Sequence, residues 1–139
     1  MKRFLLLTLL VVPFVSYSQE LKHLDYSNVI GEEEWEQLQL EYRDHFYEEL
    51  NSYRKRKLKR PLVRSEKLEC ECLEWLKEMG TKMRHDPSLR GSAEVLAYGP
   101  APLIHWQESK PHNNILLNKR MRTVGFAFYK GFACARLKR

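Results

Sequence analysis

The chain has 139 residues and a formal net charge of +6, from 24 Lys and Arg against 18 Asp and Glu. This length suits one domain and excludes tandem domains or a large barrel. A hydrophobic fraction of 43% is enough for a core and excludes a largely disordered chain. The basic excess would suit a nucleic-acid-binding protein, but the N-terminal segment argues against that function.

The N-terminal segment has the pattern of a secretory signal peptide. Lys2 and Arg3 form a basic start, an apolar run follows over 4–15, and Ser16 and Ser18 are small residues suited to cleavage. The run is too short to span a bilayer comfortably, although an uncleaved anchor is the alternative. We expect cleavage after Ser18 and a secreted or periplasmic protein. Losing 18 of the 139 residues leaves 121, and losing two cations lowers the charge from +6 to +4.

The next segment, residues 19–40, is predicted to be an N-terminal extension that runs into a first helix. The helix is expected to begin at the acidic run from Glu32, because negative charge is favoured at a helix N-terminus. Apolar side chains then recur every three or four residues, at Trp35, Leu38, Tyr42, Phe46, Leu50 and Tyr53. The basic run 54–60 and Pro61 should end this helix.

A second helix is predicted between Ser65, a good N-cap, and Gly80, a natural stop. Its apolar face consists of Leu68, Cys72, Trp75, Leu76 and Met79. A loop over residues 81–92 follows, and residues 93–98 have the character of a strand. After export no later segment is apolar enough to cross a membrane.

The last third of the chain predicts a short helix and a hairpin. Pro102 can occupy the first turn of that helix, and Pro111 is expected to end it. A strand with alternating Val124, Phe126 and Phe128, a turn at 130–131 and a return strand over 132–137 should form the hairpin. This order of elements favours an α+β sandwich with an antiparallel sheet.

The three cysteines permit a disulfide in an oxidising compartment, but an odd number leaves one thiol unpaired. Cys70 and Cys72 lie two residues apart on the predicted second helix and point in different directions. Either one could meet Cys134 on the last strand. The spacing fits no zinc motif, and at least one cysteine is expected to be a small buried residue.

Three ionisable residues lie in loops or at the ends of elements, where sites usually occur: His85, Glu94 and His112. Two imidazoles and a carboxylate could hold a divalent metal such as zinc, or supply a general base with its orienting partner. They could equally be hydrogen-bonded within the fold. The other histidines are expected at the surface or its boundary, and they are His23, His45 and His105.

Several short motifs occur in a recognisable order. They are Asn51-Ser52-Tyr53-Arg54 with Pro61-Leu62, the apolar face of the second helix, His85, the segment AEVLAYG over 93–99, the segment WQESKPH over 106–112, and TVGF over 123–126 before the closing hairpin. Together they resemble bacterial SCP domains of the CAP superfamily, which is named after cysteine-rich secretory proteins, antigen 5 and pathogenesis-related proteins. The resemblance covers about residues 41–139, which we take as the domain.

The resemblance implies an α-β-α sandwich with a central antiparallel sheet. It also implies a cleft with a His-Glu-Glu-His tetrad that can bind a divalent metal. His85 and His112 match the two histidines and Glu94 matches the first glutamate, while Ser109 stands in the place of the second. The Gly and Asn that flank the first glutamate in the family are replaced, so we expect weak or absent metal binding.

We therefore expect a secreted binding module, with no catalytic residue assigned. Its cleft would be formed by His85, Glu94, Ser109 and His112, with Tyr98 and Trp106 as apolar walls. A lipid, a cell-envelope glycan or a protein would be its ligand, and nucleic acid would not. One alternative is a weak metal- or His-assisted hydrolase of the peptidase or esterase type. Another is a structural scaffold in which the same residues form a buried network.

Overall fold

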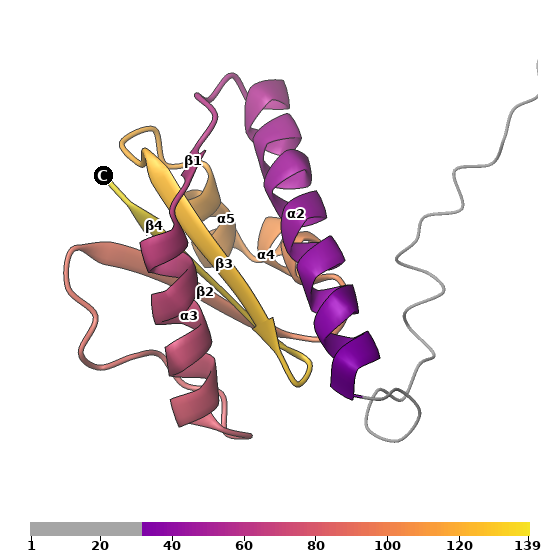
Figure 1. Cartoon of the computed structure of the whole chain (residues 1–139). Coiled ribbons are helices and arrows are strands. Elements are labelled where there is room, and N and C mark those ends of the chain that lie inside the picture. The colour runs from indigo at the N-terminus through magenta and orange to yellow at the C-terminus, as the bar shows by residue number, and fades with distance from the viewer. Residues whose placement is uncertain (1–31) are drawn as a thin grey trace, which may run out of the picture.

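The computed structural model of the chain describes residues 32–139 (Figure 1). The predicted signal peptide, most of the predicted extension and His23 lie outside the described residues, as do the side chains of Trp35 and Leu38. In chain order the elements are α2 (Glu32–Arg56), β1 (Val63–Arg64), α3 (Glu66–Met79), β2 (Ser92–Tyr98), α4 (Pro102–Glu108), α5 (Lys110–Leu116), β3 (Thr123–Tyr129) and β4 (Phe132–Lys138). Within the described part of the chain, no helix combines the length and apolar character needed to span a membrane.

The four strands form one sheet in the order β1-β3-β4-β2. β4 pairs antiparallel with β2 and with β3, as expected, whereas β1 pairs parallel with β3 over two residues. Lys130 and Gly131 both have positive φ, of 47° and 81°, which suits the tight turn of a two-residue hairpin. The predicted hairpin is therefore confirmed, and the short β1 strand is an addition to the prediction.

Helices cover both faces of the sheet, which gives the α-β-α sandwich (Figure 1). On one face α2, α4 and α5 contribute to a core whose largest fully buried members are Phe46, Leu50, Trp106, Leu116 and Phe126. On the other face α3 packs its predicted apolar side chains against Leu96, Ala127 and Cys134. The alternating side chains of β2, β3 and β4 thus contribute to two separate cores.

Gly125 allows α3 to approach the sheet at very short range. A Cβ atom at this position would lie 2.3 Å from the backbone carbon of Leu68, closer than non-bonded atoms can approach. The start of α3 is fixed by the predicted cap, because the Ser65 hydroxyl accepts a hydrogen bond from the Leu68 N–H at 3.4 Å. A glycine inside an otherwise bulky strand is therefore explained by packing.

The motif Asn51-x-x-Arg54 near the end of α2 has a structural role. The side-chain amide of Asn51 donates to the Leu62 carbonyl at 3.0 Å and accepts from the Leu62 N–H at 2.8 Å. This pair of hydrogen bonds imitates the pairing of two strands and brings the chain back along α2 toward β1. The motif that contributes to the family resemblance therefore fixes a corner of the fold.

Arg54 completes the same corner from inside. Its fully buried guanidinium donates from Nε to the Arg60 carbonyl at 2.8 Å and from Nη1 to the carbonyls of Leu116 and Asn118. The last two carbonyls lie at and beyond the C-terminal end of α5, where the helix dipole favours a cation. Arg54 therefore ties three separate segments together through uncharged acceptors.

The prediction that Pro111 ends the third helix is wrong. α4 ends at Glu108, Ser109 separates the two helices, and Pro111 lies in the first turn of α5. A proline in that turn costs no hydrogen bond, because the first N–H groups of a helix have no partner within it. His112 therefore lies on a helix instead of following one.

Candidate functional site

A buried carboxylate, that of Glu94, lies at the centre of the candidate site. Its Oε1 atom is 2.9 Å from Nδ1 of His85 and accepts from the Asp86 N–H at 3.1 Å. Its Oε2 atom accepts from Nε and Nη2 of Arg136 at 3.0 and 2.9 Å. Glu94 and Arg136 are direct partners in the β2–β4 register, so the sheet itself brings the two charges together.

Arg136 is buried and is shared by several carboxylates. Its Nη2 atom also donates to Asp86 Oδ2 at 2.7 Å, and its Nη1 atom lies 3.9 Å from Glu71 Oε2. Burial raises the pKa of Asp86, but hydrogen bonds from Ser88 and Arg136 outweigh it and leave that pKa below its ordinary value. Burial lowers the pKa of Arg136, while its bonds to Glu94 raise that pKa above its usual range. Each buried charge here therefore has a compensating partner.

His85 is held by this network but faces outward. Its side chain is 63% exposed, whereas that of the partner Glu94 is 1% exposed. Because an ionised carboxylate can only accept hydrogen bonds, the Nδ1 atom of His85 carries the proton that it donates. The Nε2 atom is then left free to face solvent, and the hydrogen bond to Glu94 fixes the orientation of the ring.

His112, from the first turn of α5, lies close enough to His85 for the two imidazoles to interact. Burial and the neighbouring His85 together lower the pKa of His112, which favours its neutral form. Ser109, one turn earlier, is half-buried, and its hydroxyl caps neither α4 nor α5. The structure thus places His85, Glu94 and His112 in one neighbourhood.

The two aromatic residues expected as cleft walls lie elsewhere. Tyr98 is exposed and packs on Phe132 with ring centroids 4.9 Å apart, four residues or about 13 Å along β2 from Glu94. Trp106 is fully buried, and its indole N–H donates to the Leu96 carbonyl at 2.9 Å. Trp106 therefore supports α4 from within the core, and Tyr98 belongs to the hairpin end of the sheet.

The trio of His85, Glu94 and His112 does not fit a zinc ion in this arrangement. Both oxygens of Glu94 accept hydrogen bonds, and Arg136 places its positive charge beside them. Among residues 32–139, no group of three or more His, Cys, Asp or Glu side chains is placed to hold a metal. The negative charge of Glu94 is therefore compensated by Arg136, a cation of the protein itself.

The cysteines separate into one exposed and two buried thiols. Cys70 is exposed, whereas Cys72 and Cys134 are fully buried and all three are free. The Cys134 sulfur lies 3.9 Å from Glu94 Oε2. Burial and a hydrogen bond with Cys72 raise the pKa of Cys134 well above its ordinary value. Of Cys70 and Cys72, it is therefore Cys72 that faces Cys134. The expectation that at least one cysteine is a small buried residue is confirmed.

Arg136 and Asp86 were not among the sequence candidates. Arg136 is the only charge in the segment 132–137, just as Glu94 is the only charge in 93–98. A lone charge on each of two apolar strands is a signal for a buried ion pair, since charges are seldom buried without a partner. That signal could have identified Arg136, although the register that pairs it with Glu94 requires the fold.

A hollow of about 450 Å³ lies beside this network, between α3 and the loop before β2. Asp86 and Arg136 belong to both the network and the hollow, and the rest of its lining includes Glu71, Glu74, Arg90 and Lys138. The walls thus carry both signs of charge and little apolar surface. A polar ligand in this hollow would contact Asp86 and Arg136, which also belong to the network that holds His85.

Three solved structures share this fold. An extracellular protein containing an SCP domain from Bacillus anthracis matches with a TM-score of 0.73 and 18% identity, over 81% of this chain and 45% of that one. A cysteine-rich secretory protein from Staphylococcus aureus matches with a TM-score of 0.65 and 20% identity, over 73% and 39%. An outer surface protein from Borrelia burgdorferi matches with a TM-score of 0.60 and 21% identity, over 69% and 91%.

The chain spans less than half the length of the first two of these proteins, and at such low identity the likeness establishes the fold alone. No match was found among curated protein sequences. The model of the cysteine-rich secretory protein family, CAP, matches residues 47–135, which is more than half of the chain and includes His85, Asp86 and Glu94 but ends one residue before Arg136. The chain therefore belongs to the cysteine-rich secretory protein (CAP) family.

Proposed function

We propose that this CAP domain is a secreted binding module that recognises a polar ligand through the exposed imidazole of His85. The observation that carries the proposal is the contrast between an exposed ring and the buried Glu94 and Arg136 that fix it. A ring fixed by a buried carboxylate loses little conformational entropy when a ligand binds to it. Secretion is supported by the predicted signal peptide and by the extracellular and outer-surface descriptions of the structural neighbours.

The same contacts favour binding over hydrolysis. Within residues 32–139, the hydrogen bond described for His85 goes to Glu94, and none joins His85 to a serine, threonine or cysteine. A histidine base that activates a nucleophile normally contacts that nucleophile or its water. Arg136 also shares the charge of Glu94, which leaves less of that charge to stabilise an imidazolium.

The hollow next to the network indicates the ligand class. A lipid chain would need an apolar cavity, whereas the walls of this hollow carry several carboxylates and cations. Hydroxyl-rich chains can exchange hydrogen bonds with such groups. We therefore expect a cell-envelope glycan as the ligand, with a protein ligand or a lipid as the other outcomes of the test.

Binding to purified peptidoglycan and to soluble cell-wall polysaccharide tests the proposal. His85→Ala should weaken binding about tenfold, the equivalent of one good hydrogen bond. His105→Ala is the matched control, because His105 is an exposed histidine on α4 that has no part in the Glu94 network. Glu94→Gln should weaken binding by a smaller factor, since it loosens the ring without removing it.

Two results would contradict the proposal. Equal binding by the wild type, His85→Ala and His105→Ala would exclude His85 as a binding residue. Cleavage of a peptide or ester library that is lost in His85→Ala or His112→Ala, at unchanged melting temperature, would instead establish the hydrolase. A zinc titration by calorimetry on the wild type and His112→Ala provides the corresponding check for a metal.

A further inference from the structure

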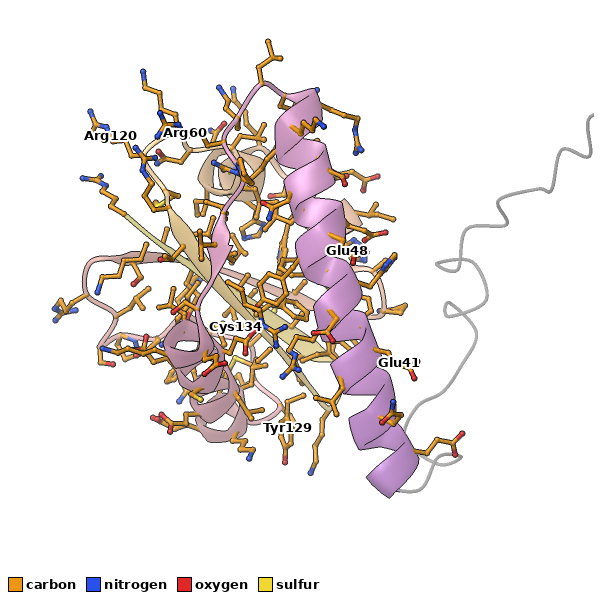
Figure 2. The ribbon with its side chains drawn as sticks, turned by 45° about the horizontal axis from the view of Figure 1, so that its top comes forward. Glu41, Glu48, Arg60, Arg120, Tyr129 and Cys134 are labelled. Carbon is orange, nitrogen blue, oxygen red and sulfur yellow. The ribbon has the colours of Figure 1, made fainter. Side chains whose placement is uncertain are left out.

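The C-terminal end of α2 and the turn before β3 form one basic surface at one end of the molecule. Buried Arg54 holds the two segments together, because it donates to the carbonyls of both Arg60 and Asn118. Figure 2 shows Arg60 and Arg120 beside each other at this end. We call this surface the basic end, and its members are Lys55, Arg56, Lys57, Lys59, Arg60, Lys119, Arg120 and Arg122.

The charge of the protein is concentrated in the basic end. No Asp or Glu occurs in residues 55–62 or 118–122. Without its eight cations, the chain's 24 basic and 18 acidic residues become 16 and 18, so the remainder is slightly acidic. The crowding has an electrostatic cost, since burial lowers the pKa of Arg54 and nearby Arg122 lowers it further.

An exposed leucine projects from the middle of the basic end. Leu58 is 94% exposed and has a positive φ of 54°. It occupies the position just after α2 where glycine is usual, because a left-handed backbone is strained for a side chain with a Cβ. The Lys59 N–H closes this turn on the Arg54 carbonyl at 2.9 Å. Leu58 therefore carries backbone strain and gains almost no burial against the other residues of 32–139.

We propose that the basic end docks on an anionic phospholipid bilayer, with its cations on the headgroups and Leu58 inserted at the boundary with the acyl chains. Charge complementarity accounts for the attraction to anionic lipid, and the bilayer supplies the apolar environment that Leu58 lacks in the free protein. A nucleic acid or a soluble polyanion would engage the cations but would give Leu58 no apolar environment. The surface is separate from the His85 site.

Co-sedimentation with vesicles tests this docking, using the form of the protein that a secreting host exports. Phosphatidylcholine vesicles with about 30% phosphatidylglycerol should bind it at least tenfold more tightly than phosphatidylcholine alone. Lys119→Gln with Arg120→Gln should reduce the binding by about tenfold or more, at roughly fivefold for each cation. Lys67→Gln with Lys82→Gln removes two exposed cations that lie outside the basic end and should leave the binding unchanged.

Leu58→Gly is the decisive variant. Because glycine relieves the strain at positive φ, the melting temperature should rise by a few degrees. Binding to the anionic vesicles should nevertheless fall by about five- to tenfold, since the apolar side chain is gone. Ile104→Ala, at a partly exposed apolar residue on α4, is the control and should not change the binding.

Three results would overturn the inference. The first is equal binding to neutral and anionic vesicles. The second is a loss of binding in the control variants as large as that in the basic-end variants. The third is full vesicle binding by Leu58→Gly together with equally tight binding of heparin, which would identify a general polyanion site with no bilayer contact.

Discussion

Two buried arginines serve different purposes in this fold, and the difference lies in their partners. Arg54 is satisfied by backbone carbonyls of three segments and has no carboxylate among its described hydrogen-bond partners. Arg136 is satisfied by the carboxylates of Glu94 and Asp86. Hydrogen bonds to backbone carbonyls fix the path of the chain. A carboxylate that is held by an arginine can in turn orient a third side chain through its other oxygen. Only the second arginine holds a carboxylate that in turn fixes an exposed imidazole, that of His85.

The largest effect is expected for Arg136→Met. This change would leave the carboxylates of Glu94 and Asp86 in a buried position without their cation, and it should lower the free energy of unfolding by about 3–5 kcal/mol. Urea denaturation at pH 7 would measure it. Adding Glu94→Gln to the variant should recover part of the loss. A loss below about 1 kcal/mol would show that the network is not a buried ion cluster.

Arg54→Met should cost somewhat less, about 2–3 kcal/mol, because it leaves neutral carbonyls without donors. The pH dependence of the free energy of unfolding should distinguish the two variants further. The cost of Arg54→Met should stay the same between pH 7 and pH 3, because carbonyls do not titrate. The cost of Arg136→Met should shrink over the same range, because protonated carboxylates no longer need the cation. Equal pH profiles for the two variants would remove the distinction.

Asp86 should make the folded state sensitive to acid. Its pKa in the folded protein lies below the ordinary value of 3.8, so on acidification the unfolded chain takes up the proton first. The stabilisation is therefore complete above about pH 4 and is lost as the pH falls through the lower, folded-state pKa. Asp86→Asn should flatten the fall in unfolding free energy between pH 5 and pH 2 by at most about 1.4 kcal/mol per pH unit. An unchanged slope would assign the acid sensitivity to other groups.

The smallest effect is expected for His85→Ala, since the ring is mostly exposed. The free energy of unfolding should change by less than about 1 kcal/mol. Because His85 helps to lower the pKa of His112, the pKa of His112 measured by NMR should move upward toward its ordinary value in this variant. A loss of several kcal/mol would instead support the structural-scaffold alternative, in which His85 serves the fold alone.

Local signals made most of the fold predictable. Ser65 and Gly80 bound α3 because caps act within one turn of their helix, and the turn at 130–131 fixes the hairpin in the same way. The two-residue strand β1 could not be predicted, because it exists only through its pairing with β3. Pro111 was assigned to the wrong helix end, since proline suits both the residue after a helix and the first turn of one.

The candidate site was predictable only in part. His85, Glu94 and His112 lie together as the family pattern implies, whereas Arg136 depends on a strand register that no local pattern reveals. Trp106 shows the opposite problem. An aromatic residue beside a polar motif can line a cleft or fill a core, and its sequence position does not say which of these faces it occupies.

The indole of Trp106 also affects how the sheet meets other molecules. β2 is the last strand of the sheet, so the Leu96 carbonyl points away from β4 toward the open edge, where Trp106 occupies it. At the other edge β1 covers only two residues of β3, and the next N–H, that of Phe126, donates to the Tyr47 hydroxyl at 2.8 Å. Unpaired groups at a sheet edge invite a strand from another chain and hence aggregation. Trp106 and Tyr47 therefore each occupy a backbone group at one edge of the sheet, and that group is no longer open to a strand of a neighbouring molecule.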